Sequence, residues 1–163
     1  MAGKQPHKVP DVDSEFPVIM EAAIENGLTP EEAMFLVAMR MTEQGPDGYE
    51  YGVKISKGTN LRTQAGQAAA SIVKNRQRYD KYVRSGGVPN YTKFFAHHGG
   101  PVGSGWAPIT DVPESESGLN SNWPKNQDHF LSQMLPTWMP RIKEWYDTSD
   151  QQKLLKQDNS PIK

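Results

Sequence analysis

The stretch "TPEEAMFLVAMRMTEQG", residues 29–45, predicts the most hydrophobic helix of the protein. Thr29 followed three positions later by Glu32 is the pattern of a capping box, in which each side chain accepts a hydrogen bond from the other residue's backbone N–H. Every residue over 33–39 is apolar, and a helix that is apolar on all sides is normally buried. Gly45 stands where a left-handed residue would end the helix. We therefore expect a buried helix that ends close to Gly45.

Glu43 stands in the last turn of this predicted helix, directly after the apolar run. Apolar surroundings disfavour the ionised form of a carboxyl group, and the C-terminal end of a helix carries partial negative charge. Both effects raise a pKa, and a carboxyl group that keeps its proton near neutral pH can act as the general acid in glycosidic bond cleavage. The alternative is that Glu43 is an ordinary solvated residue at a helix end.

The residues on either side of this stretch predict further helices. Residues 14–27 predict a short helix before it. Ser14 is a suitable capping residue, Pro17 is tolerated in a first turn, and Gly27 is a typical stop. Over 61–83, apolar residues recur at helical spacing and predict a long helix after it.

The rest of the chain predicts one β element and more helix. The segment "GYEYGVKI", residues 48–55, alternates and is rich in Tyr, Val and Ile, which predicts a strand or a small hairpin. A short helix is expected around residues 91–96. Residues 123–147 predict one or two final helices, broken near Pro136 or Pro140 because proline lacks the amide donor. The expected fold class is mainly α, within α+β, with one small β hairpin.

The composition indicates one folded domain with polar ends. A chain of 163 residues is usually a single domain, and the mean hydropathy is −0.72. The net charge of −1 argues against electrostatic binding of nucleic acid by the whole chain. Cysteine is absent, which excludes disulfides and thiolate metal sites. We expect a flexible N-terminal segment over 1–12, the folded domain over 13–147 and a polar tail over 148–163.

Four segments together resemble a known enzyme superfamily. "NGLTPEEAMFLVAMRMTEQG", residues 26–45, resembles the first catalytic helix of the lysozyme superfamily of peptidoglycan-cleaving enzymes, which includes lytic transglycosylases and bacterial glucosaminidases. "YEYGVKI", residues 49–55, is similar to the short β segment that follows in glucosaminidases. "AGQAAASIVKNRQRYDKYV", residues 65–83, resembles their alanine-rich helix. "WAPITDVPESESGLNSNW", residues 106–123, is similar to a later loop that lines the cleft in phage and bacterial members.

The resemblance implies a lysozyme-like helical domain that cleaves β-1,4 bonds between the amino sugars of peptidoglycan. Glu43 is then the general acid, water or the sugar's own hydroxyl completes the reaction, and no metal or organic cofactor is needed. The enzyme would be a glycoside hydrolase of the lysozyme or glucosaminidase type, or a lytic transglycosylase. Gln44 replaces the serine that follows the catalytic Glu in transglycosylases, so the reaction subtype stays open.

A second carboxylate, if one is used, is expected on the segment that follows Glu43. Glu50 is the predicted second catalytic residue, and Asp47 is a further candidate. The alternatives are that Glu50 is a solvent-facing strand residue and that Asp47 forms a turn. The spacing between two catalytic carboxylates decides whether a glycosidase retains or inverts the anomeric configuration. A transglycosylase mechanism needs no second carboxylate, as the resemblance implies.

Aromatic and amide side chains are the candidate groups for binding sugar. Flat aromatic faces stack on sugar rings, and side-chain amides can hold N-acetyl groups. The alternatives are that the aromatic residues pack in the core or anchor loops and that the asparagines form turns. The predicted substrate-binding residues are Tyr49, Tyr51, Tyr79, Trp106, Asn120, Asn122 and Trp123.

Two other functions compete with catalysis. The first is an inactive glycan-binding protein or virion structural protein on the same fold. The second is a module that binds RNA or another polyanion through the basic helix over 74–84. The expected partner is peptidoglycan rather than nucleic acid, and the oligomeric state is left open.

The sequence also bears on the membrane and on export. No apolar run approaches the roughly 20 residues that a membrane-spanning helix needs, so insertion into a membrane is not expected. The N-terminal residues contain no hydrophobic signal region. A protein that acts at the bacterial cell wall would then need another route, such as delivery in a phage virion or release at lysis.

Overall fold

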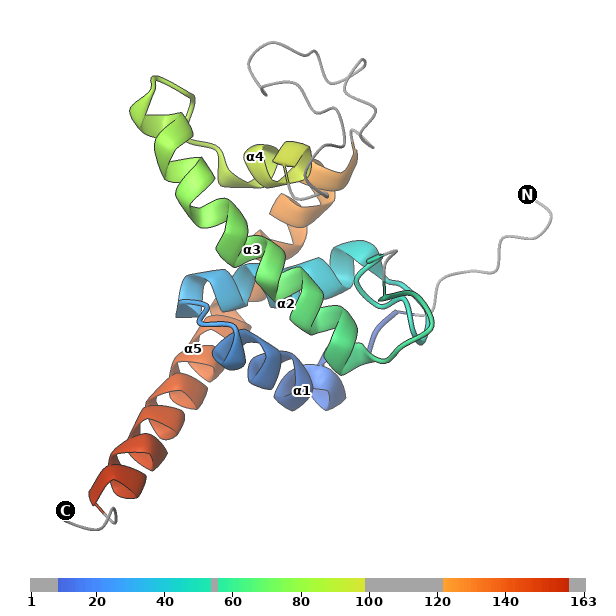
Figure 1. Cartoon of the computed structure of the whole chain (residues 1–163). Helices are drawn as coiled ribbons and strands as arrows, with labels where there is room; N and C mark the ends of the chain where they lie inside the picture. The colour runs from blue at the N-terminus through green and yellow to red at the C-terminus, as the bar shows by residue number, and fades with distance from the viewer. Residues whose placement is uncertain (1–8, 54–55, 99–121, 159–163) are drawn as a thin grey trace.

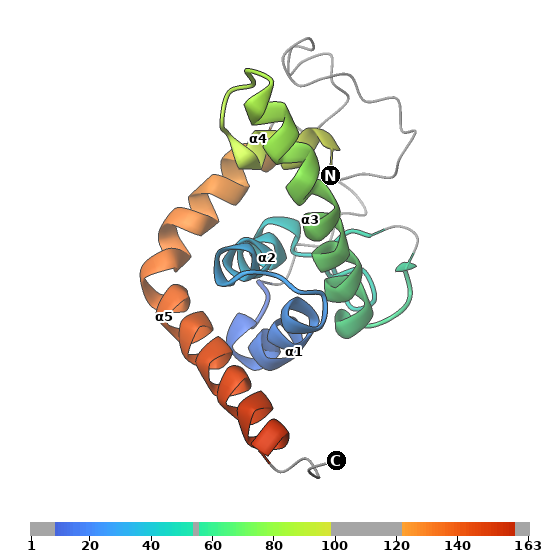
Figure 2. The same ribbon diagram turned by 60° about the vertical axis from the view of Figure 1, so that its left-hand side comes forward.

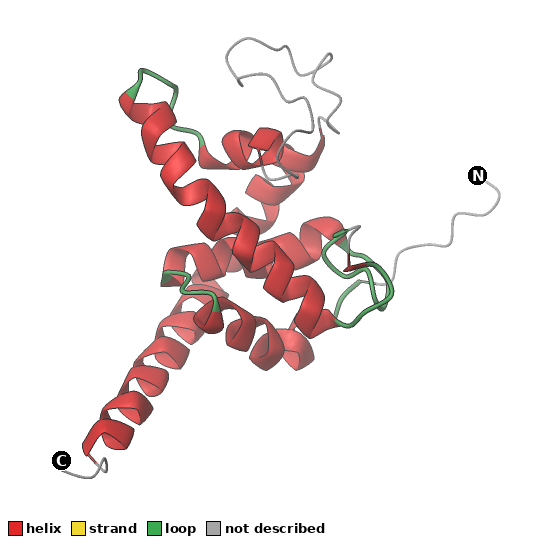
Figure 3. Ribbon diagram, in the orientation of Figure 1, coloured by secondary structure: helices red, strands yellow, loops and turns green. Residues whose placement is uncertain are grey.

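The computed structural model describes residues 9–53, 56–98 and 122–158, and the regular elements in these ranges are helices joined by loops (Figures 1 and 3). The helices are α1 (Val12–Glu25), α2 (Pro30–Glu43), α3 (Leu61–Arg84), α4 (Tyr91–His98) and α5 (Asn122–Asp158). The mainly helical class is therefore confirmed. Within the same ranges, no helix is both long enough and apolar enough to cross a membrane.

Helix α2 lies at the centre of the fold. Figure 2 looks nearly along it and shows α1, α3 and α5 on three sides, with α4 near the start of α5. The most extensive contact between two helices is that of α2 with α5. Every residue from Ala33 to Arg40 is buried, which confirms the prediction from the apolar run. The largest fully buried apolar side chains come from four of the helices: Ile19, Met20, Met34, Leu36, Ile72 and Ile142.

The start of α2 follows the sequence pattern, but its end does not. The capping box between Thr29 and Glu32 is present in both directions. The left-handed residue at the end is Gln44, with φ 47°, and not Gly45 as predicted. Gly45 is needed for another reason, because a Cβ atom there would lie 1.8 Å from the carbonyl oxygen of Tyr49. The chain therefore turns back closely on itself directly after α2.

Helix α1 begins earlier than the sequence suggested. Its N-cap is Asp11, whose Oδ1 accepts a hydrogen bond from the backbone N–H of Ser14 at 3.3 Å. Ser14 is therefore inside the helix and is not the cap, and Pro17 falls in the second turn. Gly27, with φ +75°, follows the C-cap as predicted. A carboxylate and a hydroxyl are both good caps, so either start satisfies the local chemistry.

The predicted break in the final helix is wrong. Helix α5 is continuous, with Pro136 and Pro140 inside it. Both prolines are exposed, so water can bond the carbonyl groups that each proline leaves without an amide partner. Figure 2 shows α5 curving around the side of α1 and α2, which is the bend that proline commonly causes. The domain boundary expected at residue 147 falls within this helix.

The predicted β hairpin is not seen, because the described part of segment 48–55 forms turns. The backbone N–H of Tyr49 bonds the carbonyl of Pro46, and that of Gly52 bonds the carbonyl of Tyr49. Gly52 has φ +68°, which no regular strand residue adopts. The neighbours Glu50 and Tyr51 are both buried, so the alternation of polar and apolar residues does not match the observed burial. The helices predicted over 61–83 and around 91–96 are confirmed as α3 and α4.

Candidate functional site

Glu43 is the last residue of α2 and is half-buried. Its Oε1 accepts a hydrogen bond from the indole Nε1–H of Trp123 at 2.8 Å. Trp123 is the second residue of α5, so the contact joins the end of the central helix to the start of the last one. The site therefore consists of a carboxyl group and an uncharged hydrogen-bond donor, both in partly apolar surroundings.

Several contacts hold the start of α5 in this position. The Trp123 ring stacks against Phe95 with 6.0 Å between centroids and lies 6.4 Å from Phe35. The side chains of Thr42 and Gln127 are joined by a 2.6 Å hydrogen bond, and Gln127 Nε2 donates to the carbonyl of Phe35 at 2.9 Å. The fully buried Gln127 amide therefore ties α5 to α2 one turn beyond Trp123.

Gly52 approaches the other oxygen of the same carboxyl group. A Cβ atom added to Gly52 would lie 2.8 Å from Oε2 of Glu43. Real Cβ contacts are not that short, so a larger residue would displace the Glu43 side chain. The absence of a side chain at Gly52 therefore leaves room for the carboxyl group of Glu43.

The environment of Glu43 shifts its protonation equilibrium. Burial raises the pKa of the Glu43 carboxyl group above its ordinary value, because a partly apolar setting disfavours the charged form. The hydrogen bond from Trp123 stabilises the carboxylate and lowers the pKa, but burial has the larger effect. The raised pKa agrees with the direction expected for a carboxyl group at the end of a buried helix.

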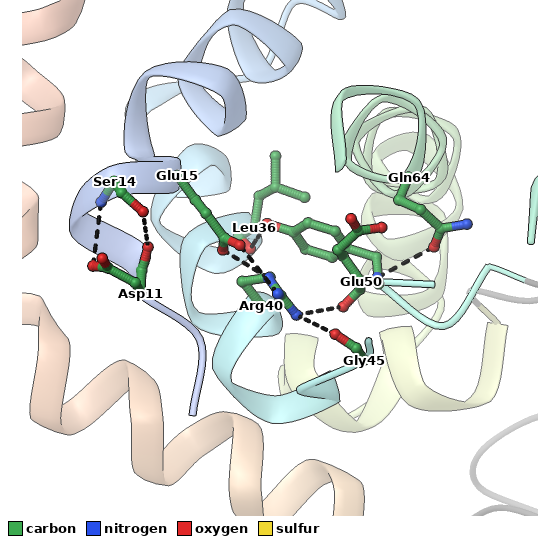
Figure 4. Close-up of polar contacts among 9 residues, drawn as sticks. Asp11, Ser14, Glu15, Leu36, Arg40, Gly45, Glu50 and Gln64 are labelled. Carbon is green, nitrogen blue, oxygen red and sulfur yellow. Dashed lines mark hydrogen bonds and ion pairs between the residues drawn. The ribbon is translucent and has the colours of Figure 1, made fainter. Parts of the chain in front are cut away.

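Arg40 organises the loop that carries Gly52 (Figure 4). Its guanidinium makes two bonds to the carboxylate of Glu15 in α1, at 2.8 and 3.1 Å. Nη1 of the same side chain donates to the carbonyl oxygens of Gly45 at 3.0 Å and Glu50 at 3.1 Å. Arg40 is only 4% exposed, so its charge is neutralised inside the protein by Glu15 while it holds the loop at two points.

Gln64 in α3 holds the same loop from the opposite side. Its Oε1 accepts from the backbone N–H groups of Tyr51 at 3.2 Å and Val53 at 3.1 Å. Its Nε2 donates to the carbonyl oxygens of Val53 and Ser56 and to the Ser56 hydroxyl, each at 3.0 Å. One fully buried side chain thus satisfies backbone groups that a partner strand would satisfy in a hairpin.

The two candidates for a second carboxylate differ in exposure. Glu50 is buried at 4% exposure, and its Oε1 has no hydrogen-bond partner in the described part of the chain. The alternative that Glu50 is a solvent-facing strand residue is therefore wrong. Asp47 is exposed in the turn after α2. The catalytic role suggested for Glu50 stays a prediction, and in this structure its carboxyl group does not face solvent.

The predicted sugar-binding aromatic residues do not all gather near Glu43. Tyr51 is 3% exposed and its hydroxyl donates to the carbonyl of Leu36 at 2.9 Å, so it belongs to the core. Tyr49 is half-buried, with Nζ of Lys57 5.3 Å from its ring centroid. Tyr79 packs edge-on against Tyr91 near the other end of α2. Trp123 is beside Glu43, but as a hydrogen-bond donor to it.

The remaining predicted residues have little or no structural description. Trp106 and Asn120 lie outside the described residues, and Asn122 is the first residue of α5. Their roles in binding sugar stay predictions.

Sequence reasoning missed Arg40, Gln64 and Gly52 as parts of the site. Arg40 had a detectable signal, since a charged residue directly after a buried apolar run needs a buried partner. Gln64 carried no comparable signal, because one glutamine near the start of a polar helix looks like a surface residue. The role of Gly52 depends on a contact with Glu43 that no local pattern encodes.

Comparisons with protein-family models, with curated proteins and with solved structures found no match to this chain. Within the described ranges, no group of three or more His, Cys, Asp or Glu side chains is placed to hold a metal ion. The functional conclusion therefore rests on the chemistry of the Glu43 site.

Proposed function

We propose that the protein cleaves β-1,4 glycosidic bonds between the amino sugars of peptidoglycan, with Glu43 as the general acid, and that its helical domain is lysozyme-like. The observation that supports this function is the half-buried carboxyl group of Glu43, which is bonded to the Trp123 indole and for which Gly52 leaves room. Its raised pKa favours the protonated form that a general acid needs.

The two oxygens of Glu43 have different surroundings, which suits proton donation. Oε1 accepts the N–H of Trp123, so Oε2 is the oxygen available to carry the transferable proton. In the proposed reaction this proton passes to the glycosidic oxygen as the bond from that oxygen to the anomeric carbon breaks. The leaving sugar departs as an alcohol. The anomeric carbon is then attacked by water or by a hydroxyl of the same sugar, and the proton that this nucleophile loses returns to the Glu43 carboxylate and restores the acid.

The proposal assigns the chemical step to Glu43 alone. Glu50 is buried, so its carboxyl group would have to become accessible before it contacted a sugar. In this account the Glu50 backbone carbonyl contributes to the loop that Arg40 holds. A reaction completed by the sugar's own hydroxyl needs no second carboxylate, and it yields an anhydro sugar instead of a reducing end.

Two other functions remain as competitors. A glycan-binding or virion structural protein could use the same surface without cleaving the bond. A polyanion-binding module would use the basic face of α3, but Arg76 on that helix is already paired with Glu32, with its Nη2 2.6 Å from Oε1. This ion pair reduces the positive charge that the helix offers to a polyanion.

Mass spectrometry of purified peptidoglycan after incubation with the protein separates these functions. The proposal predicts soluble fragments that end in either a reducing or an anhydro amino sugar, and the end group identifies the reaction subtype. Retention of the protein on peptidoglycan without any soluble fragment would instead support the glycan-binding alternative. Retention on RNA that is lost as salt increases would support the polyanion-binding alternative.

A further inference from the structure

A second candidate site lies near the opposite end of α2 from Glu43. It is a cavity of about 350 Å³ between α2, α3, α4 and α5. This volume falls within the range of small-molecule sites, which is roughly 300–1,000 Å³. Its apolar wall is formed by Met34, Phe35, Leu131, Leu135 and Met139. Leu135 is 48% exposed, so this wall is open to solvent on the α5 side.

The cavity contains a polar group that has no hydrogen-bond partner among the described residues. Tyr91 lines it, and the Tyr91 hydroxyl is buried without a hydrogen-bond partner in the described part of the chain. Burial raises the pKa of this hydroxyl well above its ordinary value, and the nearby Glu32 carboxylate adds to the increase. The hydroxyl therefore stays neutral and can both donate and accept a hydrogen bond.

The polar residues around the cavity carry excess negative charge. Glu31, Glu32 and Asp80 line it together with one cation, Arg76. Three carboxylates and one guanidinium leave a net charge of −2. Arg76 is bonded to Glu32 at 2.6 and 2.9 Å, so Glu31 and Asp80 provide the uncompensated charge. The edge-on rings of Tyr79 and Tyr91 add aromatic faces, which attract cations.

We propose that this cavity binds an amphipathic organic cation, with an apolar body against the α5 wall and an ammonium group at the Tyr91 hydroxyl and the acidic residues. The apolar wall accounts for the body, and the unpartnered hydroxyl accepts a hydrogen bond from the ammonium group. The negative charge selects against an anion of the same shape. The nearest acidic residue of the cavity on α2, Glu32, is eleven positions from Glu43, or about 16 Å along the helix at 1.5 Å per residue. The acidic part of the cavity therefore lies apart from Glu43, whereas Phe35 in its apolar wall also packs against Trp123.

Three probes of one size but different charge test this proposal. Wild-type protein is titrated with 2-phenylethylamine, 2-phenylethanol and phenylacetate, and backbone amide shifts are followed by NMR. We expect the amine to bind with a Kd on the order of 1 mM, as suits a ligand of this size. The neutral alcohol should bind on the order of tenfold more weakly, and the anion more weakly still. Amide shifts should cluster around Tyr91 and Leu131.

Two pairs of variants test which residues are responsible. Tyr91→Phe removes only the hydroxyl, and it should weaken amine binding on the order of tenfold with no loss of melting temperature. Tyr82→Phe is the control, because Tyr82 packs on Phe94 and does not line the cavity. Leu135→Ser should also weaken binding, whereas Val88→Ser, which alters an exposed apolar residue elsewhere, should not.

Three results would overturn the proposal. These are binding of phenylacetate as tight as that of the amine, amine affinity unchanged in folded Tyr91→Phe protein, and no amide shift with any probe up to its solubility. Each readout is independent of activity on peptidoglycan, so the glycan-cleavage proposal can fail while this one holds, and the reverse.

Discussion

The indole N–H of Trp123 donates a 2.8 Å hydrogen bond to Oε1 of Glu43, although 80 positions separate the two residues. Glu43 ends α2 and Trp123 lies in the first turn of α5, so the acidic group depends on how these helices pack. The bond stabilises the carboxylate, while burial favours the protonated acid. The balance between these two effects sets the pKa of Glu43 and hence, in the proposed reaction, the pH range in which it would donate a proton.

The Trp123→Phe variant tests this balance. It removes the N–H but keeps an aromatic ring against Phe95, so the pKa of Glu43 should rise because its carboxylate loses a donor. The alkaline limb of the activity profile should then move to higher pH, measured as initial release of peptidoglycan fragments. Trp145→Phe, which alters the contact with Phe16, is the matched control and should leave the limb in place. A move to lower pH would contradict the assigned role of Trp123.

The dependence of stability on pH tests the raised pKa of Glu43 without an activity assay. The folded protein holds this proton more tightly than the unfolded chain, so the stabilisation is fully present below the unfolded pKa of about 4.3 and is lost as pH rises through the folded pKa. Glu43→Gln lacks this titration. The melting temperature of the variant minus that of wild type should therefore increase as pH rises above about 4.3.

Glu32 provides a control of opposite sign for the stability measurement. Burial alone would raise the pKa of Glu32, but bonds from Arg76 and Thr29 lower it overall. Its contribution is present above the unfolded pKa and is lost as pH falls through the folded pKa. The difference between Glu32→Gln and wild type should therefore shrink toward acid pH. Equal pH trends for the two variants would show that the Glu43 environment is not as described.

A pair of glycine variants tests the close approach to Glu43. Gly52 and Gly58 both have positive φ, at +68° and +90°. Alanine at either position should cost about 1–2 kcal/mol of stability from backbone strain. Only at Gly52 would the new Cβ meet the Glu43 carboxyl group, whereas Gly58 has open space. We expect Gly52→Ala to lose at least about tenfold in the rate of fragment release, as misplacement of a catalytic group can cost, and Gly58→Ala to stay near wild type. Similar rates for both would contradict this contact.

The role of Gln64 can be tested through stability. Gln64→Leu keeps a similar volume but leaves the N–H groups of Tyr51 and Val53 without an acceptor, at a cost of about 2–4 kcal/mol. Chemical denaturation measures this loss. Gln67→Leu is the control, because Gln67 lies nearly one turn further along α3 and is exposed. This substitution should change the stability by less than about 0.5 kcal/mol. A loss below about 1 kcal/mol for Gln64→Leu would mean that water replaces the side chain.

Local patterns predicted the parts of the fold that local chemistry decides. The capping box of Thr29 and Glu32, the buried run from Ala33, and the position of Glu43 at the helix end all follow from neighbours within one helix. The hairpin prediction failed because Gln64 of α3, and not a partner strand, accepts the hydrogen bonds of the Tyr51 and Val53 N–H groups. The alternation of residue types does not follow burial either, because Glu50 and Tyr51 are both buried. The break in α5 failed because exposed prolines bend a helix that tertiary packing keeps continuous.

The site itself was only partly predictable. Glu43 was identified from its place in a helix, and its partial burial and raised pKa agree with that interpretation. Its contacts with Trp123 and Gly52 come from other segments, and they depend on packing that no single stretch encodes. For the same reason Tyr51, a plausible sugar-stacking residue from sequence, is a core residue bonded to Leu36.

The most direct test of the central claim is the rate at which Glu43→Gln protein releases soluble fragments from purified peptidoglycan. Glutamine preserves the size of the side chain but has no transferable acid proton, so the rate should fall by about 10²–10⁴-fold while the protein remains folded. Glu31→Gln, an exposed change in the first turn of the same helix, should keep nearly the full rate. Fragment release by folded Glu43→Gln at close to the wild-type rate would contradict the assignment of Glu43 as the general acid.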